Sequence, residues 1–193
     1  MEYIRKTVLV ALALTIVISI AFSSVFVYYP ITAQLSPVSP PIILDKGSNA
    51  GKPDLSGSIT VNLGENRTSA TITIHPTYQA SYYENITIIK NTDSKAYSVT
   101  LKVNTPMSLP SGSKAKLYIY QGGATRSLSG WPSSNLEPTG YMRVLDLTQT
   151  TASVTFTLNA GSFVEVDILV YIPEGSTLPS SATANIYLVY TPA

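Results

Sequence analysis

The chain has 193 residues, 12% of them charged, and its 12 basic residues nearly balance its 11 acidic ones. So few and so balanced charges exclude a basic face for nucleic acid and an acidic tract. The chain has no cysteine, so stability must come from a packed core or from joining other subunits rather than from disulfide bonds.

The N-terminal residues read as an export signal. Arg5 and Lys6 precede the apolar run Thr7–Tyr29, which contains no charged residue. A basic start followed by an apolar core directs a chain across a membrane. Pro30 ends the apolar helix, so we expect cleavage after Ala33 and an extracellular protein.

The apolar run is also long enough to span a bilayer, which leaves two other fates open. The helix could be retained as a signal anchor, with Arg5 and Lys6 holding its start in the cytoplasm. A prepilin-type cut near Lys6 would instead leave the helix on the mature subunit as a filament core. Residues 1–33 are therefore a signal peptide or a signal anchor, and the membrane is contacted only through this leader.

Residues 34–56 are an extended segment rich in proline and glycine. It contains the short apolar stretch Val38–Leu44, which has no obvious hairpin partner in the chain. We interpret this stretch as a donor strand for another copy, with candidates Val38, Ile42, Ile43 and Leu44. A plain linker, or a strand that folds back into its own domain, are the alternatives.

Residues 57–193 alternate between apolar and polar side chains, which is typical of half-buried strands. No segment after residue 33 has a helical period. The pattern predicts nine strands, at Ser58–Leu63, Ser69–Ile74, Tyr82–Lys90, Ala96–Asn104, Lys114–Tyr120, Tyr141–Leu147, Ser153–Leu158, Phe163–Ile172 and Thr183–Tyr190. We therefore predict an all-β protein with a single β-sandwich, jelly-roll-like or alternatively Ig-like.

One long connection, Gln121–Gly140, lacks any repeating pattern. Connections of this length are uncommon and are often functional. It holds the single tryptophan, Trp131. We expect Trp131 to plug the open end of the sandwich, with a contact to a sugar or a neighbouring molecule as the alternative.

Residues suited to catalysis or metal binding are sparse. His75 is the single histidine, and without cysteine it cannot build a zinc site. Glu165 and Asp167 lie two apart on one strand, a spacing that could serve a glycosidase pair or a calcium ion. We expect them instead on a solvated strand face. We therefore predict no catalytic, metal-binding or cofactor-binding residues, no cofactor and no enzyme activity.

Two Asn-X-Ser/Thr triplets begin at Asn66 and Asn85. In an exported chain each is a candidate acceptor for an N-linked glycan. Asn66 lies in a predicted turn, which favours access. Asn85 lies inside a predicted strand and needs an outward-facing side chain.

The region 38–105 resembles archaeal bundling-pilus and surface-thread subunits, which are similar in turn to the TasA–camelysin family of biofilm fibres. The resemblance lies in Gly47–Ala50, Pro53–Leu55, Ile74–Tyr78 and Ile89–Tyr97. It implies a jelly-roll-like domain that polymerises by donor-strand complementation, with the N-terminal segment of one subunit completing the sheet of the next.

The sequence thus favours a structural subunit of an extracellular filament, a pilus or thread used in adhesion or biofilm formation. The predicted partners are other copies of the chain and, at its surface, glycans. The alternatives are a membrane-anchored module that binds a glycan or protein through Gln121–Gly140, a type IV pilin-like subunit that retains its N-terminal helix, and, remotely, a hydrolase that uses His75.

Overall fold

The computed structural model describes residues 1–21, 28–128 and 137–193. The chain divides into two units, Met1–Val38 and Ser39–Ala193. The first unit begins with helix α1 (Glu2–Ala21), in which an ion pair joins Lys6 to Glu2. Within the described residues, no helix has the length and apolar character needed to cross a membrane.

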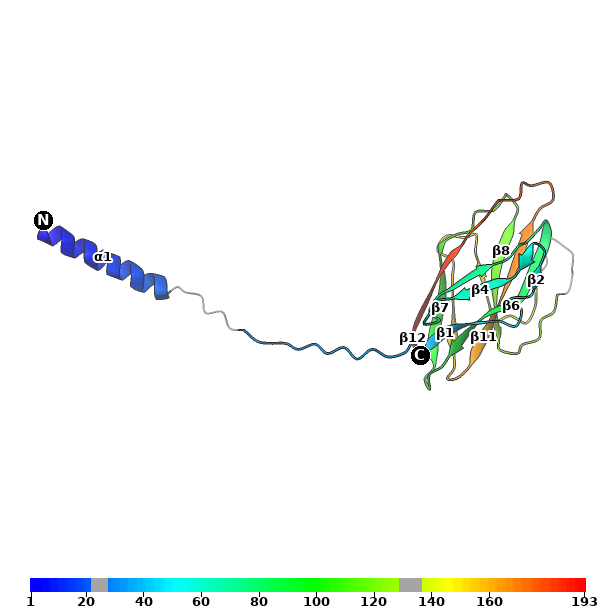
Figure 1. Ribbon diagram of the computed structural model, residues 1–193, viewed down its shortest axis with the longest axis horizontal. Coiled ribbons are helices and arrows are strands. Elements are labelled where there is room, and N and C mark those ends of the chain that lie inside the picture. Colours follow the sequence, from blue (N-terminus) through cyan, green and yellow to red (C-terminus); the bar gives the residue numbers. More distant parts are fainter. Residues whose placement is uncertain (22–27, 129–136) are drawn as a thin grey trace. The chain divides into compact units, whose positions relative to one another are not determined.

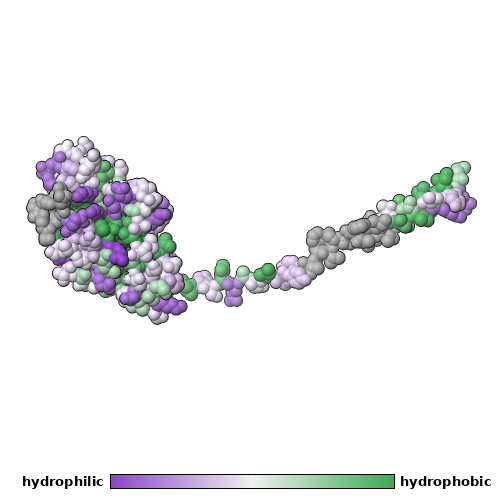
Figure 2. All heavy atoms as spheres, turned by 180° about the vertical axis from the view of Figure 1, so that it is seen from behind, coloured by the Kyte–Doolittle hydropathy of each residue, from purple (hydrophilic) through white to green (hydrophobic). Residues whose placement is uncertain are grey.

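The segment from residue 28 to residue 40 contains neither helix nor strand. The side chains of Ile31, Leu35 and Val38 are 93%, 89% and 87% exposed. Figure 2 shows isolated hydrophobic residues along this otherwise pale or polar stretch of chain.

The second unit is built on a five-stranded antiparallel sheet (Figure 1). Its central strand lies between two long neighbours, and eight of its ten side chains are buried. In spatial order the strands are β1 (Ile42–Lys46), β6 (Gln79–Asn91), β11 (Phe163–Ile172), β8 (Lys114–Gln121) and β9 (Arg143–Asp146).

A second antiparallel sheet packs against the first and completes the sandwich. It consists of β10 (Ser153–Leu158), β7 (Tyr97–Thr105) and β12 (Asn185–Pro192). Two short hairpins accompany the sheets: β4 (Thr60–Leu63) with β5 (Ala70–Thr73), and β2 (Pro53–Asp54) with β3 (Gly57–Ser58). The predicted all-β sandwich is confirmed, and each of the nine predicted strands corresponds to one observed strand.

The core lies where alternate residues of the two sheets meet. Side chains at every second position of β8 and β11, such as Leu117 and Val164, pack against those of β7 and β10, such as Val99 and Phe156. A second cluster joins the end of β11 to the β4–β5 hairpin. Each fully buried aliphatic side chain contributes about 1.5–3 kcal/mol, so these clusters set the stability of a domain that has no disulfide.

Strand β1 belongs to this fold, which differs from the expectation for Val38–Leu44. β1 pairs with β6 of its own chain, Ile42 opposite Asn91 and Lys46 opposite Thr87. Ile42 is 3% exposed and lies in the main core, and Leu44 packs against that core. The folded unit therefore begins at Ser39, ahead of the predicted boundary at residue 57. A pairing across more than forty residues leaves no local signal.

The turn after β1 fixes that strand tightly. The Gly47 N–H donates to the Ile86 carbonyl at 3.0 Å. A Cβ at Gly47 would stand 2.0 Å from the carbonyl oxygen of Asn85, so glycine is required by the close approach of the two backbones. The structure thus shows the alternative in which the strand folds back on its own domain.

Candidate functional site

Strand β6 pairs with β11 near both of its ends on one side, with an irregularity between Tyr83 and Thr87, but is paired at only one end on the other side. Its first residues, Gln79–Tyr83, pair with β11, whereas β1 covers Thr87–Asn91. Among the described residues, no strand pairs with the second side of Gln79–Tyr83. We call this stretch the open edge. An open edge presents unpaired backbone donors and acceptors to any extended chain that reaches it.

The open edge ends at Asn49, which follows β1. The Asn49 side-chain amide donates to the Glu84 carbonyl at 2.7 Å, and the Asn49 N–H donates to the Asn85 carbonyl at 3.1 Å. These bonds replace strand–strand hydrogen bonds at the point where the pairing between β1 and β6 ends. Among the described residues, no backbone partner is found on this side for the five residues before Glu84.

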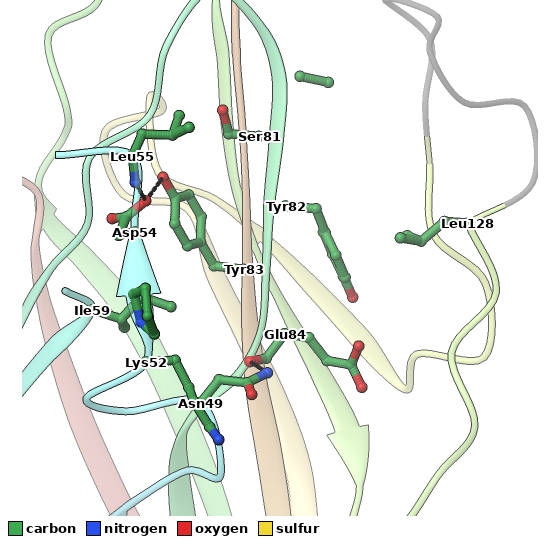
Figure 3. Close-up of a pocket in the computed structure, with 12 residues that line it drawn as sticks. Asn49, Lys52, Asp54, Leu55, Ile59, Ser81, Tyr82, Tyr83, Glu84 and Leu128 are labelled. Atoms are coloured by element: carbon green, nitrogen blue, oxygen red, sulfur yellow. Dashed lines mark hydrogen bonds between the residues drawn. The ribbon is translucent and has the colours of Figure 1, made fainter. Parts of the chain in front are cut away.

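A groove of about 620 Å³ runs beside the open edge. Residues 80–84 of β6 form one wall, and the segment from Asn49 to Ile59 forms the other. Figure 3 shows Tyr83 pointing toward Asp54 and Tyr82 pointing toward the side of Leu128. Leu55, which is 69% exposed, stands at the rim as an uncovered apolar side chain. The groove is therefore lined by both polar and apolar side chains, and one of its walls is the edge of β6.

Asp54 holds the far wall of this groove together. Its carboxylate accepts from the His75 N–H at 2.7 Å, the Leu55 N–H at 2.7 Å and the Tyr83 hydroxyl at 3.3 Å, and lies 3.0 Å from His75 Nδ1. Burial raises the pKa of Asp54, but these hydrogen bonds outweigh it and hold the pKa below its usual value. His75 therefore serves as a donor to a structural carboxylate.

The other face of the five-stranded sheet carries a buried charged cluster. Arg126, from the long connection, donates to both oxygens of Asp167, at 3.0 and 3.1 Å. It also forms an ion pair with Glu165, at 2.6 Å from Oε2. Burial lowers the pKa of Arg126, but the two carboxylates raise it overall. All three side chains are less than 10% exposed.

Tyrosines complete the cluster. The Tyr82 hydroxyl donates to Asp167, and the guanidinium of Arg126 stacks 4.5 Å from the centre of the Tyr120 ring. Burial, followed by the bond to Asp167, raises the pKa of Tyr82. Because these groups come from β6, β8, β11 and the connection, the cluster fastens the connection to the sheet.

A second charged residue fastens the other arm of the connection. Glu137 pairs with Lys116 and accepts from the Tyr118 hydroxyl at 2.5 Å. Burial raises the pKa of Glu137, but its bonds to Lys116 and Tyr118 lower it overall. Between the two arms, Ser127 and Thr139 form a backbone bridge. Trp131 lies outside the described residues.

The expectation of a solvated face for Glu165 and Asp167 is wrong. Glu165 is 7% exposed and Asp167 is fully buried, because the start of the connection lies against them: the Gly123 N–H donates to Glu165 at 3.3 Å, and Arg126 pairs with both carboxylates. The signal that could have identified Arg126 is composition: Arg126 and Glu137 are the two charged residues of Gln121–Gly140, and both pair with the sheet. Within the described ranges, no group of three or more acidic or histidine side chains is placed to hold a metal ion.

The two glycosylation candidates differ in environment. Asn66 is exposed in the turn between β4 and β5. Asn85 lies at an irregularity of β6, with φ of 41°, and its N–H donates to Asp167 at 2.7 Å. The Asn85 Oδ1 atom is buried, and Thr87 of the same triplet is 5% exposed. The structure therefore favours Asn66 over Asn85 as an acceptor.

Comparison with known proteins finds no family model and no curated sequence that matches the chain. Among solved structures, the crystal structure of the adhesin domain of Epf from Streptococcus pyogenes is similar at 11% sequence identity and a TM-score of 0.25. The match covers 79% of this chain and 58% of that one, so the chain spans little more than half of the neighbour's length. At that TM-score the similarity supports no conclusion about function.

Proposed function

We propose that the protein is a structural subunit of an extracellular filament, a pilus or thread used in adhesion or biofilm formation. The observation that carries the proposal is the extended segment ahead of Ser39, whose apolar side chains Ile31, Leu35 and Val38 are almost fully exposed. An extended segment with exposed apolar side chains can add as a strand to the sheet edge of another molecule, which buries those side chains.

If each copy donates this segment as a strand to the sheet of another copy, the copies assemble into a filament. The donating segment and the accepting sheet are different surfaces, so the contact between two copies is heterologous and does not close on itself. Each copy can both donate and accept. The resemblance of residues 38–105 to bundling-pilus subunits supports the same assembly. Because Ile42 and Leu44 are committed to the core of their own chain, the donor lies N-terminal to them.

Electron microscopy of material sheared from cells that express the chain, labelled with antibodies against residues 39–193, tests the proposal. We expect thin labelled filaments, and we expect purified full-length protein to elongate with rising concentration. Label spread evenly over the cell envelope, with monomers at every concentration in solution, would refute it and favour the membrane-anchored binding module.

A further inference from the structure

We propose that the open edge of β6, Gln79–Tyr83, is the acceptor for residues Ile31–Leu35 of a second copy. This inference rests on the proposed function and names the two surfaces that would meet. The acceptor is the stretch of β6 that β1 leaves uncovered, together with the groove beside it. The donor is the exposed segment that precedes the folded unit.

The donor has the pattern of a half-buried strand. In Ile31-Thr32-Ala33-Gln34-Leu35 the apolar and polar side chains alternate. Pro30 and Pro37 bound the stretch, and each lacks the N–H that a strand pairing needs, so pairing is confined to the residues between them. The length of this stretch matches the five residues of the open edge.

The antiparallel register decides which face of the donor lies on the side of the groove. With Ile31 opposite Tyr83 and Leu35 opposite Gln79, the apolar face of the donor lies on the same side of the sheet as Tyr83. That side holds Ile59 and, at the rim, Leu55. The polar residues Thr32 and Gln34 lie on the side of Tyr82, where the sheet carries its charged cluster. A register shift by one residue would reverse both faces.

In this antiparallel register the donor cannot come from the same chain. β1 runs antiparallel to β6 and enters beside Asn91, at the end far from the open edge. Gln79 lies opposite Ile172 of β11 and Lys90 lies opposite Phe163, so about ten strand residues, about 33 Å, separate Gln79 from Asn91. The seven residues from Leu35 to Ile42 reach at most about 25 Å, so the occupant in this register is a second copy. A parallel pairing within one chain needs only about 20 Å from Tyr83 to Asn91, and a disulfide between Ala33→Cys and Ser81→Cys within a single chain would therefore overturn the inference.

The joint sets a requirement on processing. The mature chain must retain Ile31–Leu35, which cleavage after Ala33 would not allow. A cut after Ser23 would keep the donor: Ala21 and Ser23 supply the small residues at positions −3 and −1, and the apolar core Thr7–Ala21 then has the usual length of a secretory signal. N-terminal sequencing of native material that begins at Gln34 would overturn the inference.

Engineered cysteines test the contact directly, because the chain has none of its own. We expect a disulfide between Ala33→Cys in one full-length chain and Ser81→Cys in another, since opposite residues of a strand pair lie at bonding distance. A chain that carries both should give a ladder of dimers, trimers and higher species without reductant. Ala33→Cys with Val189→Cys on edge strand β12 is the matched control. A disulfide to Val189 and none to Ser81 would overturn the inference.

Charge substitutions inside and outside the donor separate the inference from the proposed function. Ile31→Asp with Leu35→Asp should reduce the assembled fraction at least about tenfold, which corresponds to about 1.4 kcal/mol. Tyr28→Asp with Tyr29→Asp, which places the same two charges at exposed positions beyond Pro30, should not. These positions lie outside the folded unit, so thermal unfolding stays unchanged in both. Normal filaments from the first pair would refute this joint and leave the filament function standing. Disulfide-linked dimers without any filaments would support the joint and refute the function.

Discussion

Replacing Ile42 by alanine tests whether β1 is part of its own domain. Ile42 is 3% exposed and packs in the main core, opposite Asn91 of β6. Removing a buried isoleucine side chain down to its Cβ costs about 2–5 kcal/mol. In a domain of about this size, 1 kcal/mol shifts the Tm by roughly 2–4 °C, so we expect a Tm lower by roughly 4–20 °C.

Two further variants make the comparison sharp. Ile43→Ala changes the same strand at a half-buried side chain on the opposite face, and we expect about 1 kcal/mol or less. Val38→Ala changes an exposed residue just before the folded unit, and we expect a change within about 0.5 kcal/mol. Urea unfolding and thermal melts followed by circular dichroism measure all three.

The dependence of the Tm on protein concentration shows whether β1 pairs within its own domain or is exchanged between copies. The melts use chains that also carry Ile31→Asp and Leu35→Asp, which block assembly through the donor. If β1 completes its own sheet, the Tm of these chains, with Ile42 or with Ile42→Ala, does not change with protein concentration. If β1 is exchanged between copies, folding is linked to association and the Tm rises with concentration. Equal effects of Val38→Ala and Ile42→Ala, or a loss at Ile42 that disappears at high concentration, would refute the assignment of β1 to its own core.

Three other predictions follow from the site. Arg126→Met should cost about 3–5 kcal/mol, because it leaves two buried carboxylates unpaired, whereas Arg67→Met, which breaks an exposed pair, should cost about 1 kcal/mol or less; equal urea midpoints would contradict this. The pKa of Asp54 is lower in the folded state than in the unfolded state, so the ionised carboxylate stabilises the fold above its unfolded-state pKa, and this stabilisation is lost as the pH falls through its folded-state pKa. The difference in unfolding free energy between wild type and Asp54→Asn should therefore narrow below about pH 4; a constant difference across a series of unfolding measurements in acid would count against it. Mass spectrometry of native peptides should find a glycan on Asn66 and none on Asn85, and the reverse result would contradict the assigned exposures.

The strands were predictable because their signal is local. Alternation in Phe163–Ile172 marks a strand whatever it pairs with, and turn residues mark where each strand ends. The pairing of β1 with β6 was not predictable, because it joins segments far apart in the chain and Pro40 and Pro41 make the approach to β1 resemble a linker. Sequence alone could name an apolar N-terminal segment but could not say which part of it the domain keeps.

The burial of Glu165 and Asp167 could not be predicted from the pattern of their own strand. Glu165 and Asp167 alternate with valines, which is the pattern of a strand with one wet face. That inference assumes that nothing covers the polar face. Gly123–Arg126, at the start of the connection, lie against it, and Arg126 compensates the two carboxylates. This charge compensation depends on the position of a loop, and no periodic pattern in the sequence predicts that position.

The length of β6 has a mechanical consequence for the proposed filament. β1 is bonded beside one end of this single strand, and the incoming donor would be bonded beside the other. In the antiparallel register, tension draws the chain's own N-terminal segment out past Asn91 and draws the donor out past Gln79. Both sets of hydrogen bonds are then loaded lengthwise and together, so neither can open one bond at a time. Within each copy the pull passes along the backbone of β6, and between strands it passes through these hydrogen bonds, so a filament without any covalent cross-link can bear load.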